Sequence, residues 1–247
     1  MGAGVIGVTL AALATALATG LGALPFVFMK SMSRRSLGMS NAVAAGFMLS
    51  ASGALLLEGA TRGLGRVLAG FGVGVIFIAA TRRLLERRDH PLPGRLPAAD
   101  AMKSVLIVVV MTLHSFSEGV GVGVSYGGGT KLGIFITIAI AIHNIPEGLA
   151  ISLVLIPRGS RVLAAAGWSI FTSLPQPLVA APAYLFVESF RSILAAGLGF
   201  AAGAMIWLVF AELLPDARAE LESRRLALGL GGSFAVMSLL QLALLTR

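Results

Sequence analysis

The sequence predicts an all-α, polytopic integral membrane protein with eight transmembrane helices and both termini on the outer side. The 247 residues are 57% hydrophobic and 12% charged, and the mean hydropathy is +0.92. Apolar runs of about 20 residues, the length that crosses a bilayer as a helix, follow one another along the chain. The basic residues between these runs are distributed unequally between alternate loops. We therefore expect residues 1–247 to form one transmembrane domain.

The first three spans are expected at 4–29, 42–61 and 66–81. The first run has no basic segment before it and is longer than a signal-peptide core, so we expect it to be retained. The third run is the shortest and is followed directly by Arg82. The segment 82–102 contains three prolines and is expected to be a cytoplasmic loop, the only long one.

The other five spans are expected at 103–125, 131–156, 161–187, 192–214 and 226–246. In the sixth span, Pro175 and Pro177 flank Gln176. Because proline interrupts helical hydrogen bonding, we expect this helix to be broken there. Gln176 would then face a cavity or, alternatively, make a polar packing contact between helices.

The basic residues predict the orientation. Of the 19 Lys and Arg residues, 14 fall in the first, third, fifth and seventh connections. By the positive-inside rule these connections are cytoplasmic, so the 82–102 loop lies inside and both termini lie outside. The 14 residues are Lys30, Arg34, Arg35, Arg82, Arg83, Arg87, Arg88, Arg95, Lys103, Arg158, Arg161, Arg218, Arg224 and Arg225.

Composition also excludes several function classes. The net charge of +8 comes from short loops without interleaved aromatic residues, so we expect contact with anionic lipid and no nucleic-acid partner. The chain has no cysteine, which excludes disulfides, thiolate metal sites and thiol nucleophiles.

Two ionisable pairs lie where ionisable groups are costly. His114 and Glu118 in the fourth span, and His143 and Glu147 in the fifth, are each spaced i to i+4, so each pair shares one helix face near the middle of its span. A short turn joins the two spans, so the pairs are expected to face each other at the same depth. Ionisable groups inside a membrane are expensive and indicate a functional site.

One such pair would equally suit a hydrogen-bonded contact between helices. Two imidazoles and two carboxylates together favour a metal site, because this donor set suits zinc, iron(II) and manganese. Two further acids, Glu58 and Glu212, lie near the ends of the second and seventh spans. They suit either an interfacial position or the mouths of a pathway.

These segments resemble the ZIP (Zrt/Irt-like) family of divalent-metal transporters, and best the branch with H-N-x-P-E-G motifs in the fourth and fifth spans. The sequence I-H-N-I-P-E-G-L-A at 142–150 fits that pattern throughout. The sequence H-S-F-S-E-G at 114–119 has serine where the branch has Asn and Pro. A-G-F-M-L-S-A-S at 45–52 and A-E-L-L-P-D-A at 211–217 extend the resemblance over nearly the whole chain.

The resemblance implies a metal centre midway across the membrane, an elevator-like motion of spans one, four, five and six against the others, and a homodimer. Gln176 stands where relatives often have Glu, which puts a second metal position in doubt. The implied primary ligands are His114, Glu118, His143 and Glu147, with Asn144, Ser115 and Gln176 as second-site or neighbouring groups and Met48 as a neighbour from the second span.

We therefore predict a transporter that carries divalent transition-metal ions into the cytoplasm, in the cell (inner) membrane. Zinc is the first candidate, with iron(II), manganese and cadmium after it; the metal is transported substrate, and we expect no cofactor and no enzymatic activity. The alternatives are an intramembrane metal-dependent hydrolase, which would use the same ligands to activate water, and a metal-sensing membrane protein. The chain has no H-E-x-x-H helix to favour the hydrolase.

Overall fold

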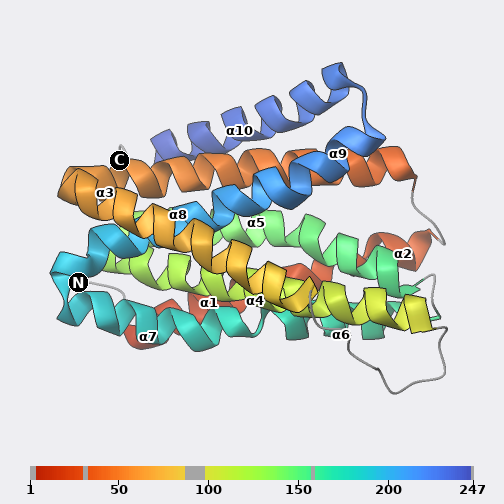
Figure 1. The fold of residues 1–247 in the computed structure, drawn as a ribbon, viewed down its shortest axis with the longest axis horizontal. Helices are drawn as coiled ribbons and strands as arrows, with labels where there is room; N and C mark the ends of the chain where they lie inside the picture. The colour runs from red at the N-terminus through yellow and green to blue at the C-terminus, as the bar shows by residue number, and fades with distance from the viewer. Residues whose placement is uncertain (1–3, 30–32, 87–97, 157–158, 246–247) are drawn as a thin grey trace.

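The computed structural model describes residues 4–29, 33–86, 98–156 and 159–245, and this part of the chain is a bundle of helices running roughly along one axis (Figure 1). The described residues contain no strand, so the prediction of an all-α protein is confirmed. The elements are α1 (Val5–Gly20), η1 (Leu21–Ala23), α2 (Pro25–Phe28), α3 (Arg34–Glu86), α4 (Ala98–Gly128), α5 (Thr130–Leu155), α6 (Val162–Ser173), α7 (Pro175–Ser189), η3 (Arg191–Ile193), α8 (Leu194–Leu208), the π-helical η4 (Val209–Leu213), α9 (Leu214–Glu220) and α10 (Ser223–Leu245).

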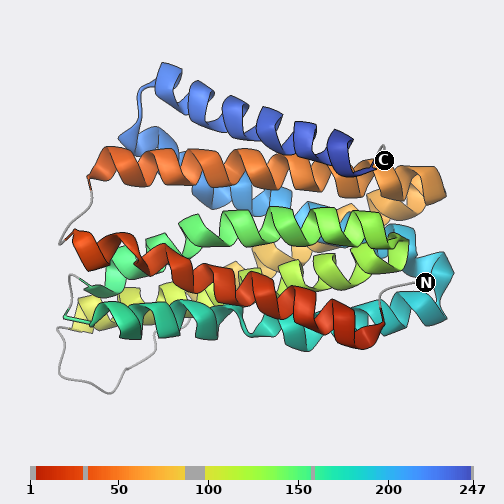
Figure 2. The same ribbon diagram turned by 180° about the vertical axis from the view of Figure 1, so that it is seen from behind.

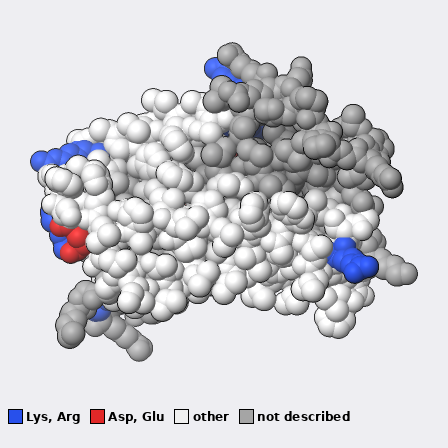
Figure 3. Space-filling view, turned by 90° about the horizontal axis from the view of Figure 1, so that it is seen from below, with Lys and Arg blue, Asp and Glu red and all other residues white. Residues whose placement is uncertain are grey.

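Several of these helices are long and apolar enough to cross a membrane. Within the described residues, six segments meet this description by length and composition. On the face shown in Figure 3, charged residues lie at the left and right ends of the bundle and at its upper edge, and the described surface between the two ends is largely uncharged. The six segments are Val5–Phe28, Arg34–Arg83, Thr130–Leu155, Val162–Ser189, Arg191–Glu220 and Ser223–Ala243.

Helix α3 reverses direction at Gly63. Its 53 residues, at about 1.5 Å each, would greatly exceed the bilayer core if they formed one straight helix. Gly63 instead has φ 152° and ψ 101°, a conformation that residues with a Cβ rarely adopt, and the chain folds back there (Figure 1). The break lies between the expected spans 42–61 and 66–81.

The sixth expected span is interrupted as predicted, because α6 ends at Ser173 and α7 begins at Pro175. Both ends of the expected third connection are helical, because α3 continues to Glu86 and α4 begins at Ala98. Residues 87–97 of the expected 82–102 loop lie outside the described residues.

The two termini lie at the same end of the bundle (Figures 1 and 2), and the largest apolar core of the described residues extends from that half as far as Met48 and Leu208. Fully buried side chains from α3, α4, α5 and α8 meet there, among them Leu55, Val122, Phe135, Ile140 and Leu198. Helix α1 adds Val8 and Ala12 to this core and packs against α5 and α7 (Figure 2). The polar residues of α4 and α5 lie next to this core, on its side away from the two termini.

Candidate metal centre

A one-residue connection sets the two His/Glu helices side by side. Helix α4 ends at Gly128 and α5 begins at Thr130. Gly129 between them has φ 146°, which a residue with a Cβ adopts only with strain. The resulting antiparallel pair brings the faces predicted from the i to i+4 spacing opposite each other.

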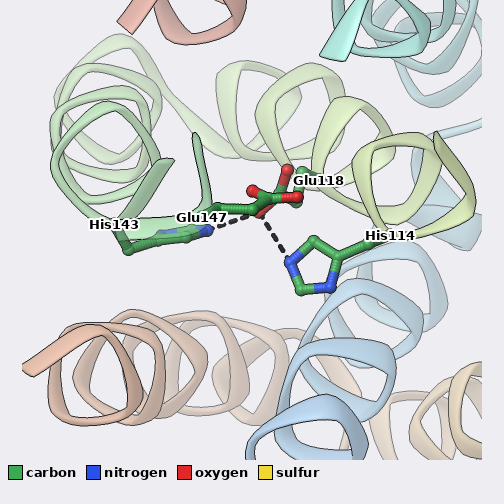
Figure 4. A group of neighbouring side chains, drawn as sticks. All are labelled: His114, Glu118, His143 and Glu147. Carbon is green, nitrogen blue, oxygen red and sulfur yellow. Dashed lines mark hydrogen bonds and ion pairs between the residues drawn. The ribbon is translucent and has the colours of Figure 1, made fainter. Parts of the chain in front are cut away.

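Four side chains converge between these helices (Figure 4). His114, Glu118, His143 and Glu147 are all buried, and each offers one ligand atom within 4.8 Å of the other three. Donors around a tetrahedral zinc ion, with bonds of about 2.0–2.1 Å, lie about 3.4 Å apart. To hold such an ion, the most distant donors of the cluster would move closer together, and the contacts from the two imidazoles to Glu118 would widen.

Glu118 is the hub of the cluster. The Nε2 atom of His114 lies 3.0 Å from Glu118 Oε1, and His143 Nε2 forms a hydrogen bond to the same oxygen. The Nδ1 atom of His143 lies 3.1 Å from the backbone oxygen of Ala139, which orients that ring. Two imidazole nitrogens thus point at one carboxylate oxygen.

Glu147 differs from Glu118 in having no hydrogen-bond partner among the described residues. Neither of its carboxylate oxygens makes a hydrogen bond with any described residue, although the residue is only 9% exposed. The Nδ1 atom of His114 and the hydroxyl of Ser115 are also buried and unpaired among the described residues. An unpaired buried carboxylate is strongly unfavourable, and a bound cation would compensate it.

A layer of neutral polar groups lies behind Glu118. Gln176, at the start of α7, donates from Nε2 to Glu118 Oε2 at 2.6 Å. The Oε1 atom of Gln176 accepts from the Thr15 hydroxyl and, at 3.3 Å, from Asn144 Nδ2. Asn144 Nδ2 also donates to the backbone oxygen of Thr15 at 2.8 Å. Helix α1 therefore supports the centre through Thr15.

A small cavity of about 30 Å³ borders the cluster. By volume it holds about one or two water-sized species. His114, His143 and Glu147 contribute to its wall together with residues of α3, α4, α5, α8 and η4, namely Asn41, Ala44, Met48, Met111, Pro146, Ala150, Leu208, Glu212 and Leu213.

Glu212 is the second acid of this cavity wall. Arg82 Nη1 lies 3.4 Å from Glu212 Oε1, and the Arg82 guanidinium lies 5.7 Å from the centre of the Trp207 ring. Glu58, the other acid considered from the sequence, pairs with Arg62 at 2.6 Å near the opposite end of the bundle. Of the two, only Glu212 borders the centre.

The structure places the other predicted site residues at different distances from the cluster. Met48 lies in the cavity wall, and Asn144 lies behind the cluster. Gln176 is hydrogen-bonded to Glu118 and is not among the described residues that line the cavity. Ser115 is fully buried, with no described partner for its hydroxyl.

Sequence reasoning missed Thr15 and Asn41. Thr15 is fully buried, but α1 also contains Thr9 and Thr19, so the sequence carries no signal that singles Thr15 out. Asn41 lies at the edge of the second expected span, where a polar residue is ordinary, so its place in the cavity wall carries no signal in the sequence.

Comparisons with known proteins agree with this geometry. The family model described as ZIP Zinc transporter matches residues 94–246. A putative zinc transporter of Arabidopsis thaliana is 49% identical over 223 residues, covering 89% of this chain and 36% of the plant protein. The chain therefore spans about a third of that relative.

Two bacterial relatives are covered more completely. The zinc transporter GufA of Myxococcus xanthus is 31% identical over 258 residues, covering 99% of this chain and 100% of the relative. The zinc transporter ZIPB of Bordetella bronchiseptica is 33% identical over 246 residues, covering 92% of this chain and 78% of the relative.

Proposed function

Because the chain belongs to the ZIP zinc transporter family, we propose that it carries divalent metal ions, zinc first among them, into the cytoplasm through the His/Glu cluster of α4 and α5. As a member of this family it is a multi-pass integral membrane transporter, and the hydrolase alternative falls away. The observation that carries the proposal is the buried Glu147 carboxylate, which has no described partner and lies beside two imidazoles and a second carboxylate.

We propose His114, Glu118, His143 and Glu147 as the metal ligands. Two imidazoles and two carboxylates bring two negative charges to the site when the carboxylates are ionised, which neutralise one dication. Asn144, Gln176 and Ser115 then belong to the polar surroundings of the ligands, and Met48 to the cavity wall. Iron(II), manganese and cadmium carry the same charge and remain candidate substrates.

We propose eight crossings. The two halves of α3 on either side of Gly63 would cross separately, and the 31 residues of α4 exceed the length that one crossing needs. With the other five apolar segments these make eight, and an even number agrees with the two termini lying at one end of the bundle (Figure 1). The positive-inside rule then places both termini outside and the third connection in the cytoplasm of a cell (inner) membrane protein.

In this orientation the described conformation faces inward. The cavity beside the cluster is lined by the cytoplasmic parts of α3 and α5 and by η4. On the outer side of the cluster, the apolar core leaves no room for a hydrated ion, since Phe135, Ile136 and Ile140 are fully buried. Metal would leave the centre past Glu147 and Glu212.

An elevator-like motion would explain how the outer side of the cluster, which the apolar core closes, becomes open. Close contacts at glycines support a division of the helices into two parts. In the first part, which comprises spans one, four, five and six, a Cβ built on the relevant glycine would overlap backbone atoms where α1 and η1 meet α5 or where α4 meets α7. In the second part, which comprises the other spans, a Cβ built on the relevant glycine would overlap backbone atoms where α3 meets α8 or where α3 meets α10. These glycines are Gly22, Gly148, Gly119 and Gly123 in the first part, and Gly70, Gly74, Gly199, Gly203 and Gly46 in the second.

The glycines between the two parts meet only side chains. A Cβ on Gly121 of α4 would lie 3.4 Å from the Ala201 side chain, an ordinary contact, and one on Gly197 of α8 would lie 3.0 Å from the Val124 side chain. Helices locked by backbone contact move together, whereas side-chain packing can slide. We therefore propose that α1, α4, α5, α6 and α7 move as one body against α3, α8, α9 and α10.

Two hydrogen bonds at the outer end reach α4 from outside the first body: one comes from Arg62, and the other from Arg191 of η3 to the backbone oxygen of Gly127 at 2.6 Å. Arg62 of α3, held by Glu58, donates from Nη2 to the backbone oxygen of Gly128 of α4 at 2.9 Å. Because the two atoms belong to different bodies, an elevator motion has to break this bond. Arg62 would then stabilise the inward-facing conformation.

The test of the proposed function is transport by the purified protein in liposomes that contain a zinc-sensitive dye. We expect metal-dependent uptake by the wild type and none by His143→Ala, with Thr9→Ala, which changes an exposed hydroxyl on α1, as the matched control. Uptake by His143→Ala at the wild-type rate would contradict the proposed site, and binding without uptake by the wild type would favour a metal sensor.

We also propose that the transporter is a homodimer, which the family resemblance implies. The mass of the protein in detergent, measured by light scattering, tests this directly. A monomeric mass with full transport activity would contradict it.

A further inference from the structure

Gln176 is fully buried, and both ends of its side-chain amide are engaged. The amide nitrogen donates to Glu118 Oε2 at 2.6 Å, and the amide oxygen accepts from Thr15 and Asn144. Its position comes from the break in the sixth span, because Gln176 is the second residue of α7. The break thus places this amide against Glu118 of α4.

Asn144 determines which way the Gln176 amide points. The Nδ2 atom of Asn144 donates to the backbone oxygen of Thr15 at 2.8 Å, so the amino group of Asn144 faces the oxygen of Gln176. The amino group of Gln176 must then face Glu118, where a carboxylate can only accept while it is ionised. The reverse orientation would place an amide oxygen against a carboxylate oxygen.

The two oxygens of Glu118 therefore have different partners. Oε2 is held by Gln176, whereas Oε1 is the atom on which the Nε2 atoms of His114 and His143 converge. Only Oε1 faces the space between the imidazoles. Glu118 can offer a metal ion this one oxygen without giving up the bond to Gln176.

We infer that Gln176 is a positioning residue that restricts Glu118 to one ligand oxygen and so selects a single, small, four-coordinate dication such as zinc. The four donors are one nitrogen from each imidazole and one oxygen each from Glu118 and Glu147. This inference rests on the proposed function. A nitrogen and oxygen donor set of four suits zinc, whereas larger or harder cations prefer six or more ligands.

The neutrality of Gln176 acts in the same direction. Glu118 and Glu147 are the only acids of the cluster, so their two charges balance one dication. A second dication beside the first would leave about two uncompensated positive charges in a buried site, which is strongly unfavourable. Gln176 thus limits both the coordination number and the number of ions.

Cobalt(II) is the probe for the test, because four-coordinate cobalt absorbs visible light strongly and six-coordinate cobalt absorbs it weakly. The purified full chain in detergent is titrated with cobalt and then with zinc and cadmium. Gln176→Met keeps the size but removes the donor, and Gln176→Glu replaces the amide by a third carboxylate. Ser173→Ala is the matched control, since it removes the buried hydrogen bond between Ser173 and Thr19 without touching Glu118.

We expect the wild type and Ser173→Ala to bind one cobalt ion with the intense spectrum. In Gln176→Met we expect a weaker band and a zinc-over-cadmium preference reduced about 10–100-fold, the usual effect of losing a group that orients a ligand. In Gln176→Glu we expect a second cobalt ion to bind.

Two results would overturn the inference while leaving the proposed function in place. One is a wild type that binds two equally tight ions or gives the weak spectrum of six-coordinate cobalt. The other is a Gln176→Met spectrum and selectivity equal to those of Ser173→Ala; if Gln176→Met does not fold, an unchanged ion count in Gln176→Glu decides in its place. A wild type that binds neither cobalt nor zinc would overturn both.

Discussion

The substitution Glu147→Gln should weaken zinc binding strongly and at the same time stabilise the metal-free protein. The Glu147 side chain is buried and its oxygens have no described partner, so glutamine of the same shape breaks no protein hydrogen bond among the described residues. The change removes one of the two negative charges of the cluster. In the metal-free protein this relieves the cost of burying an unpaired charge.

The expected loss of zinc affinity follows from the charge that remains. Breaking a buried charge pair costs about 3–5 kcal/mol, and each 1.4 kcal/mol is about a factor of ten. The dissociation constant for zinc should therefore rise by about two to three and a half powers of ten. Zinc at 100 times the wild-type dissociation constant stabilises the wild type by about 2.7 kcal/mol, and this stabilisation should nearly vanish in the variant.

Thermal unfolding of the purified protein, with and without zinc, measures both effects in one experiment. The control is Glu58→Gln, which disrupts a partly exposed ion pair with Arg62 worth about 0–1 kcal/mol and lies away from the cluster. Zinc should stabilise the control as it does the wild type. A metal-free Glu147→Gln protein that unfolds at a lower temperature than the wild type would refute the reasoning, because Glu147 would then have a structural partner.

Three further outcomes follow. Uptake should fall as the outside pH is lowered from about 7.5 to 5 at constant inside pH, because protons compete with metal for imidazole and carboxylate ligands; a constant rate would count against imidazole ligands. Gly148→Ala should destabilise the protein by about 1–3 kcal/mol in detergent, because the new methyl group meets α1 backbone, whereas Gly53→Ala meets nothing and should not destabilise; equal unfolding temperatures would contradict the close contact. The third outcome concerns a single cysteine placed at Ile140 in this cysteine-free chain and labelled from the outside. Arg62→Ala should raise its labelling rate about fivefold, the effect of losing a bond worth about 1 kcal/mol, whereas Arg66→Ala should leave the rate unchanged. Equal labelling rates in the two variants would refute the role of the outer bond of Arg62.

The sequence alone determined the features that depend on local spacing. The i to i+4 spacing of His114 with Glu118, and of His143 with Glu147, follows from helical periodicity, and the short connection around Gly129 makes their convergence foreseeable. The interruption before Pro175 was likewise predictable, because proline cannot complete the helical hydrogen-bond pattern wherever the helix packs. The motifs also identified the ZIP family, which the comparisons confirm.

The tertiary structure alone decided which side chains from distant spans meet. Nothing in the spacing places the Gln176 amide against Glu118 or Thr15 behind it, since these residues lie 58 and 161 positions from their partners along the chain. The partners depend on helix rotation and on backbone approach at glycines such as Gly119, where a Cβ would meet the Gln176 backbone. Packing also gives the two glutamates different roles, because the hydrogen bonds of the cluster reach Glu118 and leave Glu147 without a described partner at the cavity.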